Sequence, residues 1–373
     1  MFLALKEMRR AWVRFGLLIA AIGLLVFLIL FQQALQSGLV TSFVGAIRNQ
    51  SAPVLVYSVD GQRVLQGSVI SPDLEQVVRA TPDIADIGYI GQGTFTVIVA
   101  DEPADAAIIG YEREGVGSPR GLTAGRLPEQ PGEAVASEAD ADDGFDVGDT
   151  IMVEPGGLEL SVVGLAPDAQ LSVTPTLFVG YDTYLAAVAA RNPGGGDPLP
   201  NALAVVPAGS TTPAELAAAI NAGSDDLDAL TRQQAADESP GVAQVRQSFQ
   251  IIFVLYGLVV PLVTGLFFLI ITIQKAGSLT LLRAIGAPAR RLVNALLVQV
   301  LIIVGLGLVM GTALYYPLTL FDATSLSLRF DIGVVLGWSA LLVALGLASS
   351  LLAARRVLAI DPVEASTGAG VGR

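Results

Sequence analysis

Carboxylates are the residues in this sequence most able to do chemistry, because the 373-residue chain has neither cysteine nor histidine. That absence excludes thiol nucleophiles, disulfide bonds, Cys/His zinc sites and every His-based catalytic arrangement. Acid pairs such as Asp225 with Asp226, or Asp237 with Glu238, could serve a hydrolase as general acid and base. Nothing distinguishes these pairs from the other acids, and no G-x-S-x-G nucleophile motif is present. The sequence therefore predicts no catalytic residue.

A cluster of acids could bind a cation, because hard cations such as Ca²⁺ take several carboxylate ligands. Its members are Glu138, Asp140, Asp142, Asp143, Asp146 and Asp149. The spacing lacks the order and the closing glutamate of an EF-hand loop. A solvated turn with bends at Gly144 and Gly148 is the simpler interpretation, so no metal ligand is predicted and cation binding stays the lesser alternative.

The sequence offers no phosphate-binding loop. A P-loop requires a lysine directly after a glycine, whereas Lys6 follows Leu5 and Lys275 follows Gln274. The motif Gly91-Gln-Gly-Thr is a lone glycine pair, which we interpret as a turn before a strand that starts at Thr94. We expect no cofactor in this chain, and any ATP and Mg²⁺ that drive it would be bound by a partner.

The composition requires part of the chain to lie in a membrane. Hydrophobic residues make up 53% and charged residues only 15%. Four stretches without Asp, Glu, Lys or Arg are long enough to span about 30 Å of hydrocarbon, at Phe15 to Leu35, Ile251 to Ile273, Leu292 to Leu320 and Gly333 to Ala354. Because these spans hold no ionisable group, a proton relay through them is not expected.

The distribution of charge predicts which segments face the cytosol. Residues 37–249 hold 29 acids against 9 arginines and no lysine, a balance of −20, whereas the remainder carries +7. Basic residues flank the spans before the first, between the second and third, and after the fourth. Under the positive-inside rule we expect a multi-pass protein of the cell membrane with both termini cytosolic and the acidic region outside.

The acidic region is predicted to be a folded α/β domain, since short β-type runs alternate with turn residues and helical segments. Strands are expected at 54–59, 94–100, 107–110, 150–153, 158–163, 176–179 and 202–206, and helices at 72–80, 182–190, 213–222 and 226–235. Ser71 and Thr212 each precede a proline, the pattern of an N-cap followed by proline at the first helical position.

Three motifs resemble the FtsX/MacB-type ABC permeases. Leu282-Arg-Ala-Ile-Gly-Ala lies between the second and third spans, Asp361-Pro-Val-Glu follows the fourth, and Gly125-Arg-Leu-Pro begins a run of similar residues in the outside domain. The resemblance covers essentially the whole chain, although Ser366-Thr-Gly replaces the family's usual ending and no ATPase domain is fused. It implies four transmembrane α-helices with a large α/β extracytoplasmic domain, a MacB-like periplasmic core domain, between helices 1 and 2.

The resemblance also implies partners and residues for them. A cytosolic ABC ATPase would bind the coupling helix, and Asp361, Pro362 and Glu364 would cap a C-terminal helix. The predicted coupling residues are Leu279, Leu282, Arg283, Ala284, Ile285 and Gly286. A homodimer with its contact chiefly along the first and second spans, membrane lipid, and an extracytoplasmic adaptor or substrate-binding protein complete the expected partners; nucleic acid is not among them.

The predicted organisation has nine parts in chain order. They are an amphipathic cytosolic N-terminal helix (1–14), transmembrane helix 1 with a stalk (15–43), the extracytoplasmic domain (44–241), a stalk with transmembrane helix 2 (242–273), the coupling helix (274–290), transmembrane helix 3 (291–320), a short outside loop (321–332), transmembrane helix 4 (333–356) and a cytosolic tail (357–373). Two G-x-x-x-G pairs, Gly307 with Gly311 and Gly333 with Gly337, permit close helix approach.

The expected function is that of a permease which couples ATP hydrolysis in a separate subunit to movement of its outside domain. That movement would extrude a substrate or regulate an envelope process. The alternative is a membrane sensor whose outside domain binds a ligand and signals through a cytosolic partner. Against the sensor, the cytosolic side offers only a loop and a short tail, with no effector domain.

Overall fold

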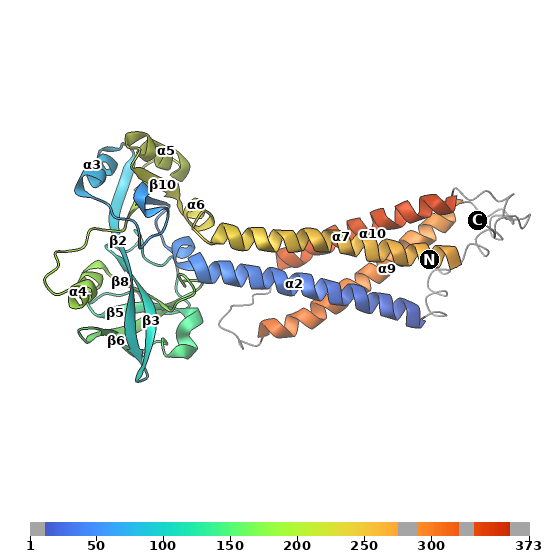
Figure 1. Cartoon of the computed structure of the whole chain (residues 1–373), viewed down its shortest axis with the longest axis horizontal. Coiled ribbons are helices and arrows are strands. Elements are labelled where there is room, and N and C mark those ends of the chain that lie inside the picture. The colour runs from blue at the N-terminus through green and yellow to red at the C-terminus, as the bar shows by residue number, and fades with distance from the viewer. Residues whose placement is uncertain (1–11, 275–288, 321–331, 359–373) are drawn as a thin grey trace, which may run out of the picture. The chain divides into compact units, whose positions relative to one another are not determined.

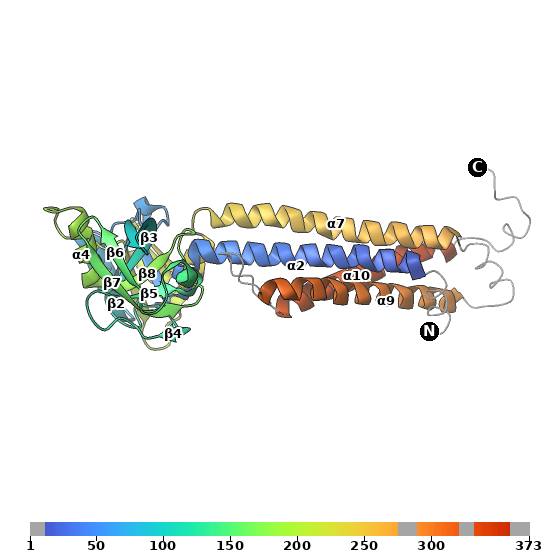
Figure 2. The ribbon, with the colours of Figure 1, turned by 90° about the horizontal axis from the view of Figure 1, so that it is seen from below.

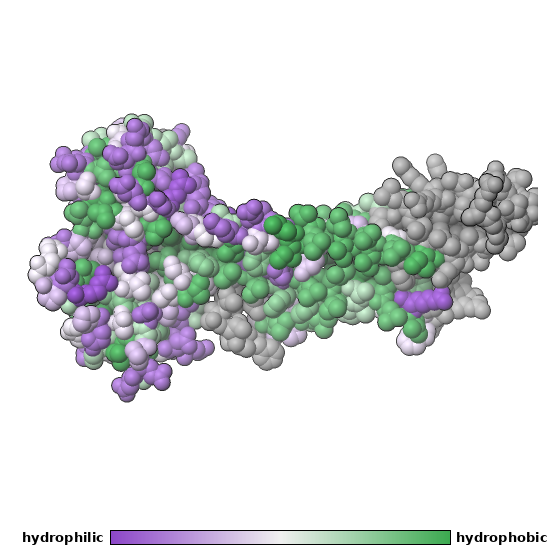
Figure 3. All heavy atoms as spheres, in the orientation of Figure 1, coloured by the Kyte–Doolittle hydropathy of each residue, from purple (hydrophilic) through white to green (hydrophobic). Residues whose placement is uncertain are grey.

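The computed structural model describes residues 12–274, 289–320 and 332–358, and the chain divides into two compact units. Residues 36–247 form most of one unit, an α/β domain, and the long apolar helices form the other. Figure 3 shows the difference in surface, with hydrophobic residues along the helices and many hydrophilic residues on the domain.

The domain is built on one mixed sheet, seen in Figure 1. In the described part of the chain the strand order is β10-β1-β9-β2-β3-β8-β5-β7-β4, and β6 pairs with both β2 and β7. Pairing is parallel between β3 and β8 and between β5 and β7, and antiparallel elsewhere. The strands are β1 Val54–Ser58, β2 Ile84–Val99, β3 Glu102–Tyr111, β4 Ala124–Gly125, β5 Glu133–Ser137, β6 Thr150–Glu154, β7 Leu158–Ala166, β8 Thr176–Gly180, β9 Ala202–Pro207 and β10 Leu227–Thr231.

Helices cover the sheet in two places. Helices α3 (Pro72–Ala80) and α5 (Pro213–Gly223) share a core with β1, β9 and β10, and α4 (Tyr181–Arg191) packs on β2 and β3. Both predicted N-caps are confirmed, since Ser71 Oγ accepts a hydrogen bond from Leu74 N, and Thr212 forms a capping box with Glu215. Asn192 to Pro198, with its three glycines, is an exposed loop for the most part.

Two local predictions were wrong. The helix expected at 226–235 is instead β10 followed by the short helix α6 (Arg232–Asp237), because Leu227, Ala229 and Leu230 are buried against β1 and Thr231 caps the new helix. The turn expected at Gly91-Gln-Gly lies inside the long strand β2. An added Cβ at Gly91 would lie 2.1 Å from the Tyr184 ring, so glycine there makes room for α4.

The apolar unit contains the helices α2 (Trp12–Asn49), α7 (Val242–Gln274), α9 (Ala289–Tyr315) and α10 (Ile332–Leu358), and a 3-10 turn follows α9 at Tyr316–Leu320. Figures 1 and 2 show the four helices running side by side. Among the described residues three helices, at Trp12–Asn49, Val242–Val263 and Leu297–Thr319, are long and apolar enough to cross a membrane. The described apolar part of α10, Ile332–Ala348, is shorter, so the fourth span stays a prediction.

One of the two G-x-x-x-G pairs is used inside the chain. An added Cβ at Gly311 would lie 2.6 Å from the Gly23 carbonyl oxygen, and one at Gly307 would lie 2.5 Å from Ile22. Helices α2 and α9 therefore approach so closely that only glycine fits. By contrast, Gly337 of the second pair has open space around its Cβ position.

Candidate functional site

The residues predicted to bind the ATPase lie outside the described part of the chain. This holds for Leu279, Leu282, Arg283, Ala284, Ile285 and Gly286 and for the cap residues Asp361, Pro362 and Glu364. Their roles stay predictions. What the structure does describe is how the domain holds the ends of the two long helices that lead to it along the chain.

The end of α2 is held by residues 167–175, which we call the clasp loop. The helical dihedral angles of α2 are interrupted at Val44, where φ is −136° and ψ is 16°. There the backbone bonds sideways to the loop: Ser172 N donates to Phe43 O at 2.9 Å, and Val173 N donates to Ser42 O at 2.8 Å. Ala46 N in turn donates to Gln170 O at 2.9 Å. These bonds satisfy groups that a regular helix would pair internally.

Gly45 and Asn49 complete this attachment. A Cβ on Gly45 would lie 2.4 Å from the carbonyl oxygen of Asp168, so the loop passes directly over the helix backbone. The Asn49 side-chain amide donates to the same oxygen at 2.7 Å and to Pro167 O at 3.3 Å. The backbone of the loop is strained, since Asp168, Ser172 and Val173 have φ angles of 50°, 56° and 59°.

A buried carboxyl group, that of Asp140, is hydrogen-bonded to the clasp loop. Asp140 is only 2% exposed and accepts hydrogen bonds from the Gln170 side-chain amide and from Thr176 N at 3.2 Å. Burial raises the pKa of Asp140 to about 6, although these hydrogen bonds act in the opposite direction. The prediction of a solvated turn is wrong for this residue, which lies in a 3-10 helix at Glu138–Asp143.

Asp237 joins the end of α2 to the start of α7. Its Oδ1 accepts a hydrogen bond from Arg246 on α7 at 2.5 Å and lies 3.7 Å from Arg48 on α2. Burial acts to raise the pKa of Asp237, but the hydrogen bond from Arg246 and further donors leave that pKa below its ordinary value. Gly241, with φ of 89°, directly precedes α7 and permits the bend that α6 and α7 need.

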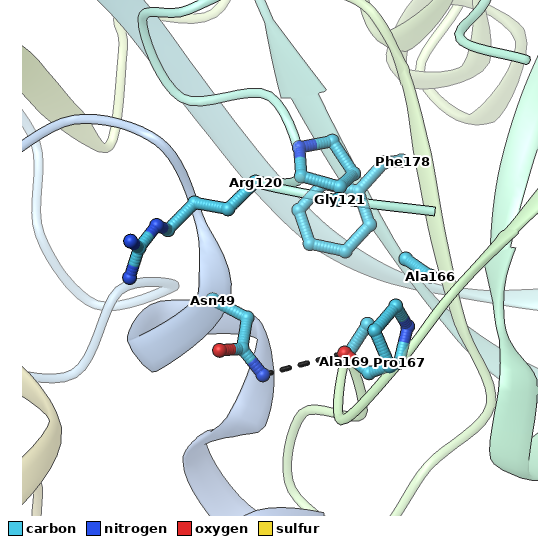
Figure 4. Close-up of a pocket in the computed structure, with 8 residues that line it drawn as sticks. Asn49, Arg120, Gly121, Ala166, Pro167, Ala169 and Phe178 are labelled. Atoms are coloured by element: carbon cyan, nitrogen blue, oxygen red, sulfur yellow. Dashed lines mark hydrogen bonds between the residues drawn. The ribbon is translucent and has the colours of Figure 1, made fainter. Parts of the chain in front are cut away.

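A cavity of about 220 Å³ opens beside the end of α2. Figure 4 shows Asn49 and Arg120 on one side of it and Phe178, Ala166 and the clasp-loop residue Ala169 on the other. A wider groove of about 650 Å³ shares Pro119, Arg120 and Gly121 with the cavity, and it continues along Ser51, Ser118, Leu122 and Leu127. Arg120 N donates to Asn49 O at 2.8 Å, so the shared strand of chain is anchored to the helix end.

The described residues contain no group of three or more acids placed to hold a metal ion, and this includes the predicted acidic cluster. Sequence reasoning also missed the clasp loop and the cavity. The only local signal for them was Pro167-Asp168 after an apolar strand, which is typical of many turns.

Comparison with known proteins shows what the chain resembles over its full length. No family model matches. An uncharacterized ABC transporter permease of Mycobacterium tuberculosis is 25% identical over 379 residues, which cover 99% of both chains. A protein of Staphylococcus haemolyticus named as a hemin transport system permease, HrtB, is 20% identical over 99% of both chains. An uncharacterized ABC transporter permease of Mycobacterium bovis is 24% identical over 79% of this chain and 78% of its own.

Two solved structures align with the domain. The periplasmic region of MacB from Actinobacillus actinomycetemcomitans has a TM-score of 0.36 and 15% identity over 50% of this chain and 92% of that one. The extracellular domain of the noncanonic ABC-type transporter YknZ from Gram-positive bacteria has a TM-score of 0.32 and 11% identity over 48% of this chain and 99% of that one. End-to-end similarity to ABC transporter permeases, together with the apolar helices, agrees with the resemblance in the motifs: over its full length the chain is similar to ABC transporter permeases.

Proposed function

We propose that the chain uses ATP hydrolysed by a separate cytosolic subunit to move its α/β domain on the outer face of the cell membrane. The observation that supports this most is the clasp of α2. A helix that begins among apolar residues ends within the domain, where backbone hydrogen bonds and a glycine contact fix its last turns. A movement of α2 would therefore reach the sheet without passing through a loose linker.

Both predicted stalks support the same proposal. Residues 32–42 and 242–250 are helical in the structure, so each continues an apolar helix. Helices are stiff over this length, whereas loops would absorb a displacement. We propose that the two stalks carry motion to the domain, with both chain termini in the cytosol and four spans in the membrane.

A homodimer is the second part of the proposal. Helix α7 presents a row of exposed apolar side chains at helical spacing, namely Ile251, Leu255, Leu258, Leu262 and Leu266, whose exposed fractions are 56% to 66%. In a membrane such a row can face lipid or a second copy of the chain. We assign it to a second copy, because the family resemblance puts the dimer contact along the first two spans.

The proposal leaves the substrate open. The name of HrtB assigns hemin to that relative. Haem iron in proteins is held by His, Cys, Met or Tyr, and this chain lacks the first two. Export of another substrate, or control of an envelope process through an extracytoplasmic adaptor, fits the described residues equally. The chain itself would bind neither ATP nor Mg²⁺.

The test is co-purification with an ATPase. The full chain extracted in mild detergent should bring an ABC ATPase with it, and the double change Leu282→Asp with Ile285→Asp should remove that partner. Two carboxylates would each need desolvation in an apolar groove, at a cost of several kcal/mol. Leu199→Asp is the matched control, since Leu199 is 44% exposed in the outer domain. Retention of the ATPase by the double variant would contradict the assigned coupling helix, and turnover of ATP by the chain alone would contradict the division of labour.

A further inference from the structure

The space beside the end of α2 combines an apolar wall with a free positive rim. Phe178, Ala166 and Ala169 are each less than 8% exposed to solvent, and with the prolines 119 and 167 they make one side of the cavity apolar. A cavity of about 150 Å³ with such walls accepts benzene. The space of about 220 Å³ here, continued by the groove, has room for a larger ring system.

Arg120 gives the space its charge. It lines both the cavity and the groove, and its side chain is exposed. Among the described residues neither Arg120 nor the neighbouring Arg232 has a carboxylate within ion-pair distance, although every other domain arginine except Arg191 has one. Arg232 donates instead to the carbonyl oxygens of Gln50 and Ser51.

The two arginines lie close enough to affect each other. Burial lowers the pKa of the Arg232 guanidinium, and the positive charge of Arg120 lowers it further. In a region whose net charge is −20, two adjacent guanidinium groups without a carboxylate partner are an exception, and they favour the binding of an anion at this point. Among the residues that line the two spaces, Glu114 is the only acid, and it lines the groove but not the cavity.

We propose that this cavity and groove bind a small amphipathic anion, whose carboxylate, or similar acid group, pairs with Arg120 while its apolar body lies against Phe178 and Ala169. The proposal does not depend on the coupling to ATP, because binding can be measured on the isolated permease. The occupant would touch Asn49, the last residue of α2, and Ala169 in the clasp loop. Binding at this site would therefore depend on how the clasp loop holds α2.

The probe for the test is 2-naphthoate, compared with 2-naphthalenemethanol and 2-naphthylmethylammonium, which share its ring system. The full chain is placed in nanodiscs of zwitterionic phosphatidylcholine, and binding is measured by equilibrium dialysis against empty nanodiscs. We expect saturable binding of the naphthoate at one site per chain, weaker binding of the alcohol, and none of the ammonium compound. Binding of naphthoate should also weaken as salt concentration rises, because the guanidinium group is exposed.

Two variants locate the site. Arg120→Gln should weaken naphthoate binding about 10- to 100-fold, the usual effect of losing a charge-assisted hydrogen bond, and should leave the alcohol unchanged. Gly121→Leu should reduce the binding of both compounds, and it should fold, since an added Cβ there meets nothing within 4 Å. Arg191→Gln and Gly196→Leu, at an arginine and a glycine that line neither space, are the matched controls.

Three results would overturn the proposal. They are equal binding of all three naphthalene compounds, naphthoate binding that both site variants leave intact, and uptake no greater than that of empty nanodiscs. The last would mean partition into lipid only.

Discussion

Replacing Gly45 by alanine should loosen the end of α2, because the added Cβ would clash with the backbone of the clasp loop. Alanine is normally the better helix residue, by about 1 kcal/mol. Here its Cβ would lie 2.4 Å from the Asp168 carbonyl oxygen and 2.9 Å from the carbonyl carbon, both of which are backbone atoms and cannot swing away. The clasp loop would have to retreat by roughly 1 Å to restore van der Waals contact.

The distance by which the clasp loop must move determines how much local stability is lost. A shift of that size lengthens the bond from Asn49 to Asp168 O, now 2.7 Å, and the bond from Ala46 N to Gln170 O, now 2.9 Å, beyond useful hydrogen-bond distance. Each bond contributes about 0.5–1.5 kcal/mol, and forced overpacking costs about 1–3 kcal/mol if the loop does not move. We expect a local loss of about 2–3 kcal/mol, which is roughly a 30- to 150-fold fall in protection.

Hydrogen exchange of the full chain, read by mass spectrometry, measures this loss. Peptides covering 42–49 and 167–175 should exchange faster in Gly45→Ala, while peptides from β1 should not change. Gly16→Ala is the control in the same helix, because nothing lies within 4 Å of its Cβ position. Gly16→Ala should leave exchange unchanged or slow it. Equal behaviour of the two variants would show that the loop does not press on α2, and the coupling through the clasp would lose its basis.

Three further predictions concern pH, assembly and topology. Because the native pKa of Asp140 is about 6 and the ordinary value is 3.8, its protonated form stabilises the fold fully below about pH 4, and this contribution disappears as the pH rises through 6. The unfolding free energy of the wild type relative to that of Asp140→Asn, measured by denaturant titration, should therefore fall by about 2 kcal/mol between pH 4.5 and 7.5. A difference that does not change with pH would refute the burial effect. Leu258→Cys should form disulfide-linked dimers in membranes, whereas Leu336→Cys, equally exposed at 62%, should not; equal cross-linking at both would remove the dimer assignment from α7. Since the chain has no cysteine of its own, Asp197→Cys should react with an impermeant maleimide in intact cells and Ser278→Cys only after permeabilisation, and the reverse pattern would invert the topology.

The class of the protein could be predicted from sequence because its signals are long. Apolar runs of about 20 residues, the bias of basic residues and the three motifs each extend over many positions, and a few exceptions do not alter them. Helix starts at Ser71 and Thr212 were also predictable, since a cap depends on residues within one turn. These features need no knowledge of what lies far away in the chain.

The attachments of α2 and several local structures could not be predicted, because they depend on contacts between distant segments. Gly91 predicts a turn when the local sequence is considered alone, whereas its reason is the ring of Tyr184, about ninety residues later in the chain. Asp140 looks solvated among five other acids until the Gln170 amide reaches it. Leu227 to Thr231 has no strong local preference, and only pairing with β1 makes it a strand. In each case tertiary packing overrides a weak local pattern.

Arg48 and Arg246 share the carboxylate of Asp237, and this implies an order in which their two contacts would break. Its contact with Arg246 is a 2.5 Å hydrogen bond, whereas that with Arg48 is a 3.7 Å ion pair without a hydrogen bond. Any motion that parts the two helix ends should break the longer contact first, leaving Asp237 with α7. Arg48 would then face water while α2 was still tied by its backbone, so the chain would pass through a half-released intermediate rather than open in one step.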